Sequence, residues 1–226
     1  MKKILISLIS VFFLIANNAN SADFGFNIGG SITAGVFSVD GASEKNEDAT
    51  INASSEKEDA EGLYALGSIF TELTVNDKFA LGVDYVPHAI ESNQITNEKE
   101  VLAGSGKTVG TNVTNVAEVH FEEITTLYAS YYVTENIYAK AGYIQADVLT
   151  KEVLGTGGAY PNTDIDGLVL GLGYEKDLAS GLFVRLEASY TDLDGVTVTN
   201  TNDSTKSITV DGITGYGAKL SIGKSF

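Results

Sequence analysis

Apolar and polar residues alternate along several stretches of this chain, most clearly between positions 167 and 176. Leu168, Leu170 and Leu172 occupy one phase there, while glycines and Glu175 dominate the other. Successive side chains of a β-strand point to opposite faces, so this pattern predicts a strand with one apolar and one polar face. The pattern recurs in eight stretches, and no segment has a helical period long enough to compete with it.

The eight predicted strands are joined by connections that alternate between long and short. The strands lie at about 24–39, 62–75, 79–86, 117–133, 137–150, 167–176, 181–193 and 208–226. Short turns fall at 76–78, 134–136 and 177–180, and long polar connections at 40–61, 87–116, 151–166 and 194–207. Each stretch has the roughly 9–11 residues that a tilted strand needs to cross a bilayer.

This arrangement predicts an all-β fold, an eight-stranded antiparallel up-and-down transmembrane β-barrel with long extracellular loops and short periplasmic turns. Closing the sheet removes its edges, whose backbone groups cannot be left bare in lipid. A soluble secreted sandwich is the alternative interpretation. Its turns would not sort into long and short ones at opposite ends, so the barrel is favoured.

The first residues have the pattern of a secretory signal peptide. Lys2 and Lys3 precede an apolar run over 4–16, and small polar residues follow. The run is shorter than the roughly 20 residues of a spanning helix, which disfavours a retained membrane anchor. We expect a signal peptide over residues 1–21, cleaved after Ser21 or, as second choice, Ala22. The barrel domain then covers residues 22–226.

Composition agrees with an exported sheet protein and narrows its chemistry. The chain has 24 Gly and 11 Tyr but 2 Pro, which favours strands over helices. It has no Cys, which removes disulfides and thiolate chemistry. The formal charge is −16, and loss of Lys2 and Lys3 would make the mature domain more acidic still. Such acidity disfavours nucleic acid as a partner.

If the apolar phase faces lipid, the opposite phase lines the interior of the barrel. Six charged residues fall in that phase at a similar height above the periplasmic rim: Glu72, Asp84, Lys140, Arg185, Glu187 and Lys219.

Arg185 is the only arginine of the chain. Its planar guanidinium can bind two carboxylates, so its expected partners are Glu72, Asp84 and Glu187. Eight strands enclose side chains rather than a wide aqueous channel, and buried charges are tolerable only when paired. We therefore expect a filled, charge-paired interior, with a small gated pore as the alternative.

Acidic residues gather in the first long connection: Asp40, Glu44, Glu47, Asp48, Glu56, Glu58, Asp59 and Glu61. The simplest interpretation is a solvated loop. The functional alternative is weak binding of Ca²⁺ or Mg²⁺, bridging the loop to anionic lipopolysaccharide. The spacing of the acids does not follow the EF-hand pattern, so this alternative is the weaker one.

His88 and His120 are the only histidines, which excludes a multi-histidine metal centre. We expect neither a metal nor a cofactor. His120 is predicted on the inner face near the extracellular end, with Glu122 beside it. A histidine–acid pair could support catalysis, but no nucleophile motif accompanies it. We therefore expect a polar lining and no enzymatic activity, with a lumenal enzyme as a remote alternative.

The last predicted strand presents Tyr216, Leu220, Ile222 and Phe226 on its apolar face. Together with the signal peptide, the eight strands and the charged inner layer, it resembles the small OmpA-type and opacity-type outer-membrane barrels of Gram-negative bacteria. The resemblance spans residues 22–226. It implies a location in the cell outer membrane, among its lipids and lipopolysaccharide. It further implies that the outer-membrane assembly machinery reads these four residues, with periplasmic chaperones as transient partners.

Three functions are compatible with these features, in order of preference. The first is a structural or surface-interaction barrel, whose extracellular ligand the sequence does not name. The second is a narrow channel for small solutes or ions. The third is an enzyme in the lumen. No periplasmic peptidoglycan-binding domain is expected after the eighth strand.

Overall fold

The computed structural model describes residues 24–46, 58–76, 78–92, 94–100, 112–155 and 158–226. These residues form β1 (Phe24–Asn46), β2 (Glu58–Val75), β3 (Phe79–Tyr85), β4 (Ile90–Glu91), β5 (Ile95–Glu100), β6 (Asn112–Tyr132), β7 (Ile137–Leu154), β8 (Thr163–Asp177), β9 (Leu182–Thr199) and β10 (Lys206–Ser225). A single 3-10 turn, Ala179–Gly181, precedes β9. None of the described residues forms a helix that is long and apolar enough to cross a membrane.

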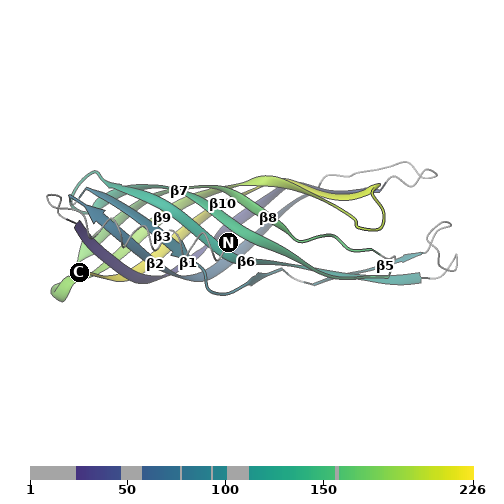
Figure 1. Ribbon diagram of the computed structural model, residues 1–226, viewed down its shortest axis with the longest axis horizontal. Helices are drawn as coiled ribbons and strands as arrows, with labels where there is room; N and C mark the ends of the chain where they lie inside the picture. The colour runs from purple at the N-terminus through teal and green to yellow at the C-terminus, as the bar shows by residue number, and fades with distance from the viewer. Residues whose placement is uncertain (1–23, 47–57, 77, 93, 101–111, 156–157) are drawn as a thin grey trace.

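The strands close into one antiparallel barrel (Figure 1). Each strand pairs with its neighbour in the order β3-β2-β1-β10-β9-β8-β7-β6, and β3 also pairs with β6. The short strands β4 and β5 pair with β6 as well, so they continue the position of β3 along the wall. The prediction of an eight-stranded antiparallel barrel is confirmed.

One end of the barrel carries short turns and the last residue of the chain (Figure 1). The turns join β2 to β3, β6 to β7 and β8 to β9. At this end Phe226 pairs with Phe26 through two backbone hydrogen bonds, of 2.9 and 3.2 Å. These bonds complete the ladder between β10 and β1.

At the other end the strands are longer than predicted and form two extensions (Figure 1). One extension contains the ends of β1, β9 and β10, and the other contains β5 with the ends of β6 and β7. The predicted long connections are therefore wrong at their boundaries. Valine and threonine alternate over 196–199 of β9, and β-branched residues favour strands even where no apolar face marks them.

A β-bulge in β6 changes which side chains face inward. The register with β7 shifts between Glu122 and Thr125, so one extra residue stands in β6. Glu123, inside this shift, has a positive φ of 53°. The irregularity lies in β6, opposite Gln145 of β7, while the pairing of β7 with β8 continues without a shift. Because a one-residue insertion reverses the alternation, His120 faces outward and Phe121 inward.

The interior contains two layers of different chemistry. Near the short turns it is polar and charged. At the level of the bulge it is apolar, with a buried cluster of Val86, Ile124, Ala146 and Ile165. Phe121 and other half-buried apolar side chains pack against this cluster. The alternating pattern did not predict this apolar layer, because the bulge and the end of β3 interrupt the phase there.

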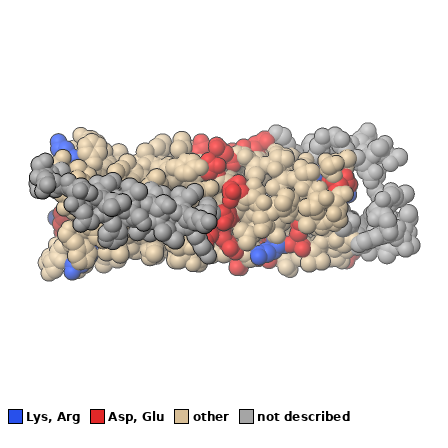
Figure 2. All heavy atoms as spheres, in the orientation of Figure 1, with Lys and Arg blue, Asp and Glu red and all other residues tan. Residues whose placement is uncertain are grey.

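The outside of the barrel carries exposed apolar side chains, among them Ile32, Leu170, Leu186 and Leu220. Acidic residues follow them on the same strands toward the extensions, and Figure 2 shows acidic side chains as a band across the molecule. Beyond the apolar positions of these strands, the exposed acidic residues are Asp40, Glu61, Asp164, Asp192 and Asp194. The change from apolar to acidic marks one edge of the lipid-facing surface.

The ladders that hold the wall differ in length. The ladder between β1 and β10 runs, with one interruption, from Asn27 to Asn46. The ladder between β2 and β3 covers only Ile69–Val75. Beyond it, no described strand pairs with this side of β2, and the backbone N–H of Gly67 donates instead to Nε2 of His88 at 3.1 Å.

Candidate functional site

The candidate site is a layer of ion pairs that crosses the barrel interior. Its centre is Arg185 on β9, which binds Glu72 on β2 with both terminal nitrogens, at 2.6 and 2.7 Å. The two side chains are 6% and 1% exposed, respectively. This bidentate geometry gives the strongest form of carboxylate–guanidinium contact, and the surrounding low dielectric strengthens it further.

Arg185 is also held from the side of the short turns. Its Nε binds Glu175 on β8, and a terminal nitrogen donates to the Tyr132 hydroxyl at 3.1 Å. The Tyr132 hydroxyl in turn donates to Glu175 at 2.8 Å. The guanidinium lies over the ring of Phe183, 4.5 Å from its centre, where a cation–π interaction adds to the ion pairs.

Two lysines complete the layer. Lys140 on β7 binds Glu187 on β9, and Lys219 on β10 binds Asp84 on β3 at 2.7 Å. All six charged residues of the inner phase thus lie in the interior and are paired. Asp84 and Glu187 were predicted as partners of Arg185, and this detail was wrong, because a lysine reaches each of them.

Uncharged side chains satisfy most of the remaining polar atoms. Glu72 accepts hydrogen bonds from Tyr128 at 2.9 Å and from Asn27 at 3.2 Å. Glu187 accepts one from Tyr138 at 2.9 Å. The side chains of Ser31 and Ser221 bind each other at 2.9 Å.

Sequence reasoning missed these tyrosines, although the chain carries a signal for them. Tyr128 pairs in register with Gly82, and Tyr138 pairs with Gly173. A Cβ atom on Gly82 would lie 2.4 Å from the Tyr128 ring, and one on Gly173 would lie 2.2 Å from the Tyr138 ring. Each glycine therefore leaves the space that the neighbouring ring fills. Inward tyrosines opposite inward glycines are the pattern to search for.

The layer leaves almost no room for water. The free space between its side chains is about 10 Å³. A cavity needs about 10–15 Å³ to hold one water molecule, so the layer has space for one at most. A chain of waters, which an ion or polar solute needs to pass, does not fit between these side chains.

The predicted acidic loop is largely strand where the structure describes it. Asp40 and Glu44 belong to β1, and Glu58, Asp59 and Glu61 belong to β2. The predicted loop boundaries are therefore wrong, while Glu47, Asp48 and Glu56 lie outside the described residues. Asp59 accepts a hydrogen bond from the Gly41 backbone at 2.9 Å. Within the described part of the chain, no three of these acids come within ligating distance of one another.

The four residues expected to guide assembly lie on the outer face of β10 and at its end. Tyr216, Leu220, Ile222 and Phe226 are all exposed. The ring of Phe226 lies 6.4 Å from that of Phe26, and the ammonium of Lys224 lies 5.1 Å from the centre of the Phe226 ring. The residues around both candidate cleavage positions, Ser21 and Ala22, lie outside the described part.

His120 was predicted to line the lumen with Glu122, and this prediction is wrong. Glu122 pairs in register with Asp147, and His120 with Leu149. These β7 residues share the outward face of Tyr143, because the β7–β8 register continues without a shift. The bulge therefore places His120 and Glu122 on the outside, and they form no lumenal catalytic pair.

A closed barrel of eight antiparallel strands, apolar outside and ion-paired inside, defines the class of small β-barrels of the outer-membrane type. No protein-family model and no curated protein matches the chain.

Several solved outer-membrane proteins have a similar fold. The structure of AlkL in DMPC bilayers is 15% identical over 92% of this chain and 92% of its own, with a TM-score of 0.48. Ail of Yersinia pestis, solved with the heparin analogue sucrose octasulfate, is 11% identical over 88% of this chain and 99% of its own, with a TM-score of 0.36. The protease OmpT of Escherichia coli is 9% identical over 92% of this chain and 99% of its own, with a TM-score of 0.37. At these values the likeness concerns the fold alone.

Proposed function

We propose that this chain is an integral outer-membrane protein whose closed barrel is a rigid platform for its surface-exposed strands. The observation that carries the proposal is the packed ion-pair layer, which has free space of about 10 Å³. The apolar cluster around Ile165 lies beyond it and adds a second barrier. Two packed layers of opposite chemistry favour a structural or surface-interaction role over a channel.

The outer surface supports a position in the outer membrane. Its apolar side chains would contact lipid, and the acidic band would lie at the level of the lipopolysaccharide headgroups. The four outward residues of the last strand, Tyr216, Leu220, Ile222 and Phe226, would serve the assembly machinery as its recognition signal. A signal peptide over residues 1–21 would direct export, and mass measurement of the mature protein would distinguish cleavage after Ser21 from cleavage after Ala22.

The two extensions would carry the surface interaction. They are built from paired strands, β1 with β9 and β10 on one side and β5 with β6 and β7 on the other, so they present backbones of fixed shape. The chain has a formal charge of −16, which repels polyanions. A ligand of the heparin type, as in the Ail complex, is therefore disfavoured, and a neutral or cationic surface partner is favoured.

Conductance of the refolded protein in a planar bilayer tests the closed barrel. We expect no stepwise current from the parent protein. Arg185→Ala combined with Ile165→Ala removes one large side chain from each layer, and this variant should conduct. Lys224→Ala, on the outer rim, is the matched control and should be silent.

Stepwise current from the parent protein would overturn the proposal and favour the channel. A silent double variant that inserts and folds like the parent would show that the two layers are not the barrier. Heat-modifiable migration on gels, measured for each variant, verifies that it has folded before conductance is compared.

A labelling experiment tests which end faces the medium. The chain has no cysteine, so single cysteines can be introduced without background. In intact cells a membrane-impermeant maleimide should label Asp203→Cys, between β9 and β10, and should spare Glu135→Cys, in a short turn. Equal labelling of both, or labelling of the second alone, would contradict the proposed orientation.

A further inference from the structure

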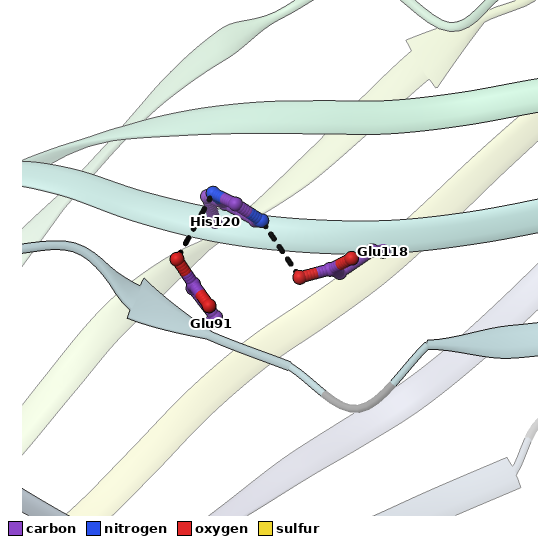
Figure 3. Close-up of side chains that lie close together, drawn as sticks. All are labelled: Glu91, Glu118 and His120. Carbon is purple, nitrogen blue, oxygen red and sulfur yellow. Dashed lines mark hydrogen bonds and ion pairs between the residues drawn. The ribbon is translucent and has the colours of Figure 1, made fainter.

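His120 lies on the outer face of β6, among carboxylates from two strands. Glu118 precedes it by two residues on β6, and Glu91 on β4 is its partner in register. Figure 3 shows both carboxylates directed at the imidazole ring, one toward each nitrogen. The bulge is responsible for this arrangement, because it turns His120 from the lumen to the side where the glutamates lie.

The carboxylates surround the ring closely. Nε2 of His120 lies 2.8 Å from Glu118, and Nδ1 lies 3.9 Å from Glu91 and 4.0 Å from Glu122. The imidazole is 15% exposed, whereas the Glu91 side chain is 61% exposed. The imidazole of His120 is therefore held in place by its surroundings, while the carboxylate of Glu91 can move in the solvent.

Among the described residues, the carboxylates of this group have no lysine or arginine as an ion-pair partner. Lys151 on β7 is opposite Glu118 in register, but the ion pairs that the structure shows for Glu91, Glu118 and Glu122 are all with His120. The interior acids Glu72 and Asp84 differ, because each has a basic partner. Three carboxylates surround one imidazole, so the group carries an excess of negative charge, and a cation is the ligand that it fits.

We propose that His120, Glu118 and Glu91 form a binding site for a divalent transition-metal ion of the zinc type. One ligand atom from each residue lies within 4.8 Å of the others. Two ligands of a tetrahedral zinc ion are about 3.3 Å apart, so modest side-chain rotation closes the site. Imidazole nitrogen with carboxylate oxygens suits zinc or copper, whereas calcium prefers oxygen ligands alone.

The count of two histidines argues only against a multi-histidine centre, and the proposed site needs one histidine. The proposed ion joins β4 to β6 close to where the β2–β3 ladder has ended. Ile90, next to Glu91, packs on the apolar cluster inside the barrel. A metal at this position therefore fastens the short strand β4 to the wall and holds Ile90 over the interior.

Calorimetric titration of the folded protein with zinc chloride tests the site. We expect one ion per chain at micromolar affinity, and at least a tenfold weaker affinity for His120→Ala and for Glu118→Gln. His88→Ala is the matched control, because it removes the only other histidine, whose ring binds backbone atoms of Gly67 and Ala89. It should bind zinc like the parent. Glu118→Gln changes the charge but not the shape, so it serves if His120→Ala fails to fold.

Two results would overturn the inference. One is zinc binding that His120→Ala and Glu118→Gln leave unchanged, and the other is an equal loss in His88→Ala. A second measurement examines the structural consequence. Zinc should raise the unfolding midpoint of the parent and of His88→Ala but not that of Glu118→Gln, because only a ligand bound to the folded state stabilises it. Calcium at the same concentration should leave all midpoints unchanged.

Discussion

Removal of Arg185 should destabilise the barrel more than removal of its main partner. In Arg185→Ala, Glu72 keeps only the hydrogen bonds of Asn27 and Tyr128, and no described cation reaches it. In Glu72→Ala, the guanidinium keeps its ion pair with Glu175. The first change leaves a buried, uncompensated charge, and the second leaves a charge that is still paired.

The burial of the pair sets the expected magnitude. Glu72 is 1% and Arg185 is 6% exposed, so solvent cannot replace a lost partner. Breaking a buried ion pair by removing one side costs about 3–5 kcal/mol. We expect Arg185→Ala to lie near the upper end of this range and Glu72→Ala near the lower end. The double variant should lose about 2 kcal/mol less than the sum of the two, because the residues interact directly.

Urea unfolding in lipid vesicles measures these free energies. The chain has no tryptophan, so circular dichroism and the gel shift of the folded barrel are the suitable signals. Lys224→Ala is the control, and as a surface change it should alter the unfolding free energy by less than about 0.5 kcal/mol. Two results would refute the reasoning. Additive losses of unfolding free energy in the double variant would show that Arg185 and Glu72 do not interact directly. A smaller loss for Arg185→Ala than for Glu72→Ala would show that the unpaired Glu72 charge is not the larger cost.

Three further predictions concern packing and closure. Lys140→Met should lower the urea midpoint of unfolding more than Lys219→Met, because the Lys140 side chain is 7% exposed and the Lys219 side chain is 15% exposed. The reverse order of the two midpoints would contradict this. Gly173→Ala should reduce the folded fraction on gels, since its Cβ would lie 2.2 Å from a tyrosine ring, whereas Gly30→Ala, whose nearest neighbour would be 3.7 Å away, should fold normally. Phe226→Ala should slow assembly in cells but leave the unfolding free energy nearly unchanged, because the ring is 70% exposed and its backbone bonds to β1 persist.

Much of the barrel follows from local alternation. Leu168, Leu170 and Leu172 define the outward phase of β8 without reference to any other strand. The same rule assigns Arg185 and Glu187 to the inner phase of β9, and both are buried there. The period of a strand is a property of its own backbone, so a single sequence is enough to obtain it.

The partners across the lumen do not follow from alternation. Which acid meets which base depends on the register between strands far apart in sequence and on the tilt of the barrel. Glu175 was overlooked because it lies closer to the short turns than the six charged residues of the inner phase. Those six were grouped because they lie at a similar height in the barrel. Asp84 and Glu187 were assigned to Arg185 by charge alone, although lysines are in reach of both.

The bulge in β6 could not be predicted for a different reason. Glu123 has a left-handed backbone conformation, which glycine or asparagine usually adopts, so no residue type signals the irregularity there. One extra residue then reverses the assignment of the predicted strand positions from Ala117 to Glu122. His120 was placed on the wrong side for this reason.

The unequal ladders of the wall have a consequence for how the barrel opens. Local opening costs least where the fewest backbone bonds must break together, which is along β2 and β3, over Ile69–Val75. The ladder between β3 and β6 is equally short, but β4 and β5 continue it along β6. Amide hydrogens in the β2–β3 ladder should exchange with deuterium sooner than those between β1 and β10. The ladder between β1 and β10, which closes the barrel, is thus the most stable part of the wall. The barrel opens first between β2 and β3, which are adjacent in sequence.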